Sequence, residues 1–215
     1  MAVVVAAPFN LGLVGLWLPG ALADTPLATW AFLPAAAGPA LGVLAARRID
    51  RRTVRRTTIL GADVRLSTLT AVVPLVAFAT VGGIGWLLPT VALIYALGEE
   101  IGWRGYLTDA LHRYAPGVRY SLVALVWWPW HLRFETPFDW FVFPWIVFAS
   151  SWVLGHAARE SGSVLVAAAM HATVMLLTMS GPPSRSLLLA GGLALGGWIL
   201  LGWLFPNQRA RGTEA

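Results

Sequence analysis

Long runs of apolar residues, separated by short polar connections, are the main pattern along the chain. A helix needs about 20 apolar residues to cross a lipid bilayer, and most of these runs approach that length. The pattern therefore predicts an all-α, polytopic integral membrane protein with about eight transmembrane helices. The predicted spans are residues 2–23, 26–46, 66–86, 89–111, 119–134, 138–158, 162–180 and 185–205.

The composition supports this class and narrows the chemistry. Of the 215 residues, 58% are hydrophobic and only 12% are charged, whereas soluble domains carry about 25% charged residues. The absence of cysteine excludes disulfides, thiolate metal sites and a cysteine nucleophile. All 15 basic residues are arginine, so Schiff-base chemistry and a Ser-Lys dyad are excluded as well.

The arginines are concentrated in the connection at 47–65, which contains seven of them. Positively charged connections remain in the cytoplasm, so alternation of the spans places both termini there. We interpret the net charge of +5 as this topology signal and predict no nucleic-acid partner. The predicted location is the cell membrane, with the lipid bilayer as partner and anionic headgroups against the 47–65 segment.

The first apolar run ends in Ala-Leu-Ala before Asp24, which is similar to a signal-peptidase site. The residues directly after Met1 include no positively charged n-region, however, so a retained first helix is preferred over a cleaved signal peptide. We predict a two-helix unit with the Arg-rich loop at residues 1–65, a six-helix core at 66–205 and a short cytoplasmic tail at 206–215.

Charged residues interrupt one of the apolar spans. Glu99, Glu100 and Arg104 have apolar residues on both sides, and ionised groups at this depth cost several kcal/mol unless they pair or line a wet cavity. His131 and His171 lie in two other spans. With a rise of about 1.5 Å per residue, Glu100, His131 and His171 lie roughly 16, 18 and 14 Å from the cytoplasmic helix ends. Three helices thus carry ionisable groups to nearly the same level.

Glu100 and Arg104 are four positions apart, so they share a helix face in the favourable order. Glu99 is rotated by about 100° from Glu100 and has no partner in the pattern, which suits a general acid or base. Two alternatives stay open: the Glu100–Arg104 pair is purely structural, or the histidines only bond to neighbouring helices. His112 and His156 lie near helix ends, and we expect them to be structural.

These residues resemble the motifs of a known family, the CAAX protease and bacteriocin-processing (CPBP/Abi) family of intramembrane proteases. Its first motif is Glu-Glu-x-x-x-Arg. Here Glu99, Glu100 and Arg104 match it and are followed by Gly-Tyr-Leu in the way that the family shows. In a membrane chain this motif is fairly specific.

The other two motifs follow in the family's order on later apolar segments. The second, Phe/Trp-x-x-x-His, is matched by Trp127 and His131, and the third, His-x-x-x-Asn, by His171 and Met175. Each is weakly specific by itself. The resemblance covers about residues 90–178 and identifies the 66–205 core as the catalytic part.

The resemblance implies an eight-span helical core with a cavity open to the membrane or the cytoplasm, and peptide-bond hydrolysis. It implies that Glu99 activates a water molecule, that His131 helps to hold it, and that His171 helps to stabilise the oxyanion. Glu100 and Arg104 position the first motif. The family has also been described as metalloproteases, and Glu99, His131 and His171 are a plausible zinc set. We prefer the mechanism without metal or other cofactor.

The chain departs from the family at Met175, which has no N–H where the third motif has an amide. A lost oxyanion donor costs about 2.7–4 kcal/mol in the barrier. Thr178 is seven residues after His171 on the same face, so its hydroxyl is the predicted substitute. Trp127 belongs to the neighbourhood of the substrate, and the tryptophans around it are expected to serve for packing or as interfacial anchors.

The preferred function is an intramembrane endopeptidase. Its substrate would be a prenylated-type C-terminal tail, a secreted peptide leader or another membrane protein. The alternative is a non-enzymatic membrane immunity or scaffold protein that binds a peptide partner in the same cavity, which Met175 favours. A small proton-coupled transporter is a third reading, but the chain shows no internal repeat or paired broken helices.

Overall fold

The protein is all-helical, as the sequence predicted. The computed structural model describes residues 33–49, 57–131, 134–178 and 183–204. Within these ranges the only extended pairing is an isolated bridge between Thr58 and Ser163. The helices are α3 (Leu33–Ile49), α4 (Val64–Thr80), α5 (Leu87–Gly102), the π-helical η3 (Trp103–Leu107), α6 (Thr108–Ala110), α7 (Pro116–Trp130), α8 (Pro137–Phe141), α9 (Phe143–Ser161), α10 (Val164–Thr178) and α11 (Arg185–Leu204).

Seven of the eight predicted spans have a helical counterpart in the described ranges, with shifted ends, and the span 2–23 lies outside them. The predicted span 66–86 ends early, at Thr80, because Gly83 and Gly85 adopt positive φ angles of 70° and 67° in the turn that follows. The span predicted at 138–158 is divided into α8 and the longer α9. The number of helices that cross the membrane stays a prediction.

Among the described helices, α11 alone is long and apolar enough to cross a membrane by length and composition, while α4 and α10 are shorter apolar helices. The most apolar stretch of α11 has a mean hydropathy of 1.9. The helix directs its large side chains outward: Leu188, Leu189 and Ile199 are more than half exposed, while the small Ala190 and Ala194 are fully buried. Such a distribution suits an apolar environment around the helix.

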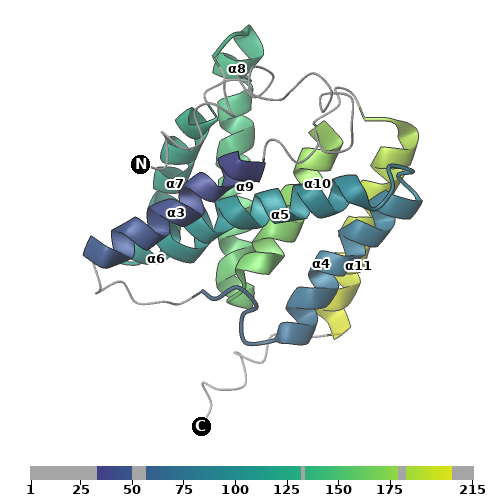
Figure 1. Ribbon diagram of the computed structural model, residues 1–215, viewed down its shortest axis with the longest axis horizontal. Coiled ribbons are helices and arrows are strands. Elements are labelled where there is room, and N and C mark those ends of the chain that lie inside the picture. The colour runs from purple at the N-terminus through teal and green to yellow at the C-terminus, as the bar shows by residue number, and fades with distance from the viewer. Residues whose placement is uncertain (1–32, 50–56, 132–133, 179–182, 205–215) are drawn as a thin grey trace.

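The helices pack in two groups around α10 (Figure 1). On one side α4 and α11 lie side by side, and Trp198 Nε1 of α11 donates to the Thr70 carbonyl of α4 at 2.9 Å. On the other side α7 and α9 pack together, and the Ser151 hydroxyl donates to the Tyr120 carbonyl at 2.8 Å. Helix α5, which carries the two glutamates, contacts α10 and is thereby held between the groups.

Small residues bring α3 very close to α5 (Figure 1). A Cβ atom at Gly98 would lie 2.8 Å from the Ala36 carbonyl oxygen, and one at Gly102 would collide with Pro39. The close approach therefore requires glycine on this face of α5. Successive helical residues are rotated by about 100°. Because Gly98 faces α3, Glu99 and Glu100 are turned away from α3. The predicted boundary at residue 65 stays a prediction, although α3 packs directly on the helix that carries the glutamates.

Three connections meet at one end of the helix bundle. The backbone N–H and the hydroxyl of Thr57 both donate to the Asp109 carboxylate at 3.1 Å. The Thr58 N–H donates to the Gly162 carbonyl at 3.0 Å. The segment before α4, the end of α6 and the junction of α9 with α10 thus lie together. The sequence predicts all three on the cytoplasmic side, and this orientation stays a prediction.

Candidate active site

Glu99 is surrounded by hydrogen-bond donors from α5 and α7 and is only 1% exposed. Within the described residues, Oε1 accepts from the Tyr95 hydroxyl at 3.0 Å and from Trp130 Nε1 at 3.1 Å. Oε2 accepts from Trp127 Nε1 at 3.1 Å. A carboxylate has about four acceptor positions, so these three hydrogen bonds leave one acceptor position of Glu99 unused.

The expectation that Glu99 lacks a partner is therefore wrong. It rested on the charged residues alone and overlooked neutral donors. Tyr95 lies one helical turn before Glu99, so the i, i+4 spacing would have indicated it. Trp127 and Trp130 share a helix face at i, i+3, but only the packing of α7 near α5 brings their N–H groups to the carboxylate. They are hydrogen-bond donors and not merely packing residues.

Glu100 is fully buried and binds two cationic or ionisable groups through one oxygen. Arg104 Nη1 donates to Oε1 at 2.8 Å, which confirms the predicted pair. His171 Nδ1 lies 2.9 Å from the same oxygen, a link that the sequence did not indicate. Because the Glu100 carboxylate accepts a hydrogen bond, Nδ1 of His171 is the donor and carries the proton of a neutral ring. Nε2 of His171 is then an acceptor.

The Trp127 ring contacts residues from all three motifs. The Arg104 guanidinium carbon lies 4.3 Å from its ring centroid. The rings of His131 and His171 lie 5.5 and 5.1 Å from it, the second in an edge-to-face arrangement. Its Nε1–H binds Glu99. One indole thereby brings Glu99, His131 and His171 together, although they come from three different helices or helix ends.

His131 follows the last residue of α7 and is half-buried, unlike the other members of this cluster. Its backbone N–H bonds to the Trp128 carbonyl at 3.2 Å, so the Trp127 carbonyl is left to the ring, whose Nδ1 lies 2.9 Å away. Nδ1 therefore donates, and Nε2 of a neutral ring is an acceptor. The ring packs edge-to-face against Phe143 at 4.8 Å.

Arg104 lies in a π-helical turn, which the sequence did not predict. The Thr108 hydroxyl donates to the Trp103 carbonyl at 2.8 Å, five residues back, and the Thr108 N–H bonds to the same oxygen. Single π-turns inside α-helices occur frequently at functional sites. The widened turn begins at Trp103, three residues after Glu100, and the N–H and hydroxyl of Thr108 both bind the Trp103 carbonyl.

The zinc alternative gains no support from the placement of the three side chains. Nε2 of His131 and of His171 remains an acceptor, as a zinc ligand requires, but both oxygens of Glu99 already accept hydrogen bonds from protein donors. In the part of the chain that the structure describes, no group of three or more His, Asp or Glu side chains is placed to hold a metal ion. We derive no step through a metal.

The third motif ends among apolar residues. Met175 is half-buried and packs against the apolar cluster that joins α4, α5, α10 and α11. Thr178 is exposed, and its hydroxyl donates to the Val174 carbonyl of its own helix at 2.9 Å. A hydroxyl bonded in this way points along its own helix, so its predicted part as substitute donor gains no support from the geometry.

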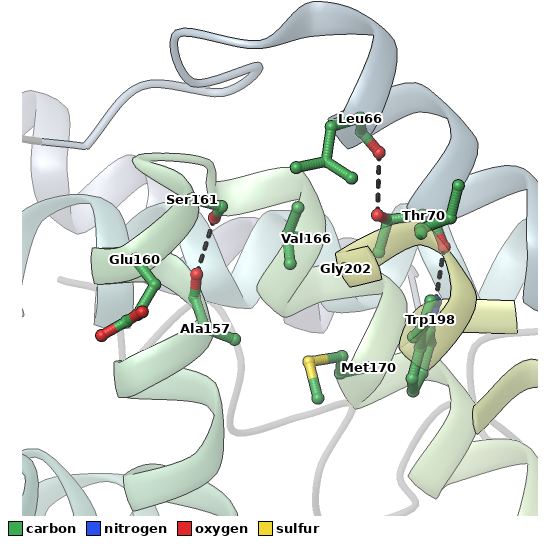
Figure 2. A pocket seen from close by; sticks show the side chains of 10 residues that line it. Leu66, Thr70, Ala157, Glu160, Ser161, Val166, Met170, Trp198 and Gly202 are labelled. Atoms are coloured by element: carbon green, nitrogen blue, oxygen red, sulfur yellow. Dashed lines mark hydrogen bonds between the residues drawn. The ribbon is translucent and has the colours of Figure 1, made fainter. Parts of the chain in front are cut away.

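Two cavities in the described part of the chain have walls to which Glu99, His131 and His171 do not contribute. One, of about 210 Å³, lies between α4, α9, α10 and α11 and is mostly apolar, with Glu160 at its edge (Figure 2). The other, of about 440 Å³, is polar, and Arg104 forms part of its wall. Arg104 therefore links the glutamate–histidine cluster to a second, polar space.

Comparisons with known proteins agree with the motif resemblance. Residues 69–177, just over half of the chain, match the family model described as type II CAAX prenyl endopeptidase Rce1-like. No curated protein and no solved structure matches the chain. The matched range contains the two glutamates, Arg104 and both clustered histidines. The chain therefore belongs to the Rce1-like CAAX endopeptidases, a branch of the CPBP family of membrane proteases.

Proposed function

We propose that the chain is an intramembrane endopeptidase that hydrolyses peptide bonds of membrane-associated or C-terminal-tail substrates. One observation carries this proposal: a buried carboxylate, Glu99, is held in place by three neutral donors, beside a second carboxylate that is neutralised by Arg104 and linked to His171. An ion pair with a purely structural role would not need the first carboxylate. We propose that the protein lies in the cell membrane with both termini in the cytoplasm.

In this mechanism Glu99 takes a proton from water. The remaining acceptor position of its carboxylate binds one water hydrogen, and Nε2 of His131 binds the other. The water oxygen then attacks the carbonyl carbon of the peptide, and Glu99 receives the proton. When the C–N bond breaks, Glu99 returns this proton to the leaving amine, so it acts first as base and then as acid.

The oxyanion of the tetrahedral intermediate needs a hydrogen-bond donor, and His171 is the proposed one. Since Nδ1 of His171 already donates to Glu100, Nε2 can donate only from the protonated ring. The buried Glu100 carboxylate is placed to stabilise such an imidazolium, and Arg104 holds Glu100 in position. Glu100 and Arg104 are thus positioning residues.

The decisive experiment compares Glu99→Gln with Glu135→Gln in full-length protein reconstituted into vesicles. Glu135 is exposed and outside the cluster, so the two variants make the same chemical change at different places. The substrates are membrane-anchored peptides with an exposed C-terminal segment. On these, Glu99→Gln is expected to lower the cleavage rate by a factor of roughly 10²–10⁴. Glu135→Gln is expected to keep it. Equal rates in both variants would rule out Glu99 as the base.

Met175 favours one alternative, a non-enzymatic membrane protein that binds a peptide in the same place. The side chain offers no donor and packs among apolar residues. The absence of any cleavage across a broad library of anchored peptides, together with binding of a peptide that Glu99→Gln leaves unchanged, would establish that alternative.

A further inference from the structure

The polar cavity of about 440 Å³ lies at the end of the bundle where three connections meet. Its wall includes Arg104 from η3, Asp109 from α6, Arg119 from α7 and Arg159 from α9, together with Thr57. Four helical elements and the segment before α4 thus contribute to one space. Three of the lining side chains are arginines and one is a carboxylate.

Two of these arginines have buried N–H groups that no neighbour accepts. In the part of the chain that the structure describes, Nε and Nη2 of Arg104 and Nε of Arg119 are buried without a hydrogen-bond partner. Arg104 is 1% exposed and Arg119 is 8% exposed. Leaving a charged donor buried and unpaired is costly, so these groups indicate an acceptor that the chain itself does not supply.

The cavity has an excess of positive charge. Arg104 is balanced by Glu100 on its other side. Asp109 is the carboxylate in the wall, and both of its oxygens accept hydrogen bonds from Thr57. Nη2 of Arg119 donates to the carbonyl oxygens of His112 and Tyr114, at 2.8 and 2.9 Å, and these acceptors are neutral. One bound anion would complete this arrangement.

We propose that this cavity binds a phosphate group. Guanidinium groups match the oxygen geometry of phosphate with paired N–H donors, and here they converge from three separate helical elements. Thr57 in the cavity wall belongs to the sequence stretch 47–65, which is rich in arginine and is predicted to face the cytoplasmic headgroup layer. The phosphate comes either from an anionic lipid headgroup or from free phosphate, and the chemistry of the site is the same for both.

Bound phosphate would act on the proposed active site through Arg104. This side chain binds Glu100 with Nη1, while Nε and Nη2 remain for the anion. An anion held there fixes the guanidinium from both sides. It thereby orients Glu100 and, through Glu100, His171. The proposal concerns a separate site, and it stands even if the chain has no peptidase activity.

The test measures the thermal unfolding midpoint of the full chain in neutral detergent, followed by tryptophan fluorescence. Inorganic phosphate is compared with chloride at equal ionic strength, and phosphatidylglycerol with phosphatidylcholine in mixed micelles. The variant is Arg159→Gln, because Arg159 is exposed and its replacement spares the buried packing; Arg119→Gln is the second variant. Arg113→Gln is the matched control, since Arg113 is exposed and does not line the cavity.

At roughly 100 times its Kd, a phosphate ligand is expected to raise the midpoint by about 5 °C or more in the wild type and in Arg113→Gln. The shift is expected to fall at least by half in Arg159→Gln and Arg119→Gln. Phosphate also strengthens apolar burial in general, so the difference between variants is the readout. Shifts with both ligands identify free phosphate as sufficient, and a shift with phosphatidylglycerol alone identifies a lipid headgroup.

Two results would overturn the proposal. One is the absence of a shift in the wild type with either ligand. The other is an equal shift in Arg159→Gln and Arg113→Gln. A shift produced by a peptide with a free C-terminal carboxylate, but by neither phosphate source, would assign the cavity to a peptide terminus instead. None of these outcomes depends on peptide cleavage, so failure here is distinguishable from failure of the proposed function.

Discussion

Replacing Trp127 by phenylalanine removes one N–H group from the cluster and keeps an aromatic ring in its place. The indole N–H donates to Glu99 at 3.1 Å, and the ring packs against Arg104 and both clustered histidines. Glu99 would keep its two bonds at Oε1 and lose the one at Oε2. The substitution therefore tests whether this indole holds the carboxylate.

The size of the effect follows from these contacts. A hydrogen bond to a charged acceptor contributes about 1.5–3 kcal/mol. Phenylalanine keeps part of the contact with Arg104, because its ring also attracts a cation. For a chain of this size, 1 kcal/mol corresponds to about 2–4 °C in Tm, so Trp127→Phe is expected to lower Tm by about 3–12 °C. Cleavage is expected to fall at least about tenfold if Glu99 is the base.

The neighbouring Trp128 provides the matched control. Its Nε1 is buried and has no hydrogen-bond partner among the described residues. Trp128→Phe therefore removes an unsatisfied donor, and Tm is expected to stay constant or to rise slightly. Thermal unfolding in detergent measures both variants. Equal changes in Trp127→Phe and Trp128→Phe would refute the idea that the bond to Glu99 matters.

Three further predictions test the surroundings of the cluster. Arg104→Ala leaves Glu100 buried without its cation, so the free energy of unfolding should fall by about 3–5 kcal/mol; a normal Tm would show that the pair is dispensable. A reporter active only outside the cytoplasm should give no signal when fused after Arg56 and a signal when fused after Pro137, and the reverse pattern would invert the topology. Met175→Asn should raise the cleavage rate, with the few kcal/mol of an oxyanion donor as the upper limit; unchanged kinetics would place the second donor elsewhere.

Much of the candidate site could be predicted from local spacing. The distance of four positions between Glu100 and Arg104 is sufficient to place both side chains on one helix face, and the structure contains this pair. The apolar runs predicted helices because their length and composition leave no other way to satisfy the backbone in lipid. The motif order also led to the family that the comparison supports.

Some local features escaped this reasoning although they are short-range. The bond from Tyr95 to Glu99 is an i, i+4 contact, but a neutral hydroxyl adds nothing to the pattern of charged residues on which the prediction rested. The π-helical turn around Arg104 depends on Thr108 bonding back five residues. Nothing in the composition of this segment distinguishes it from an ordinary α-helical turn.

The amino-acid sequence by itself determined the helical class, the charged residues inside an apolar span and the pairing within one helix, because all three follow from composition and from contacts a few residues apart. Tertiary structure alone decided that Glu99 binds indoles of α7, that His171 binds Glu100, and that arginines of three helical elements surround one cavity. The contacts of the two glutamates join residues 28 to 71 positions apart. At such separations the spacing of residues along the chain does not indicate which side chains face each other. Only the packing of the helices establishes which donor meets which acceptor.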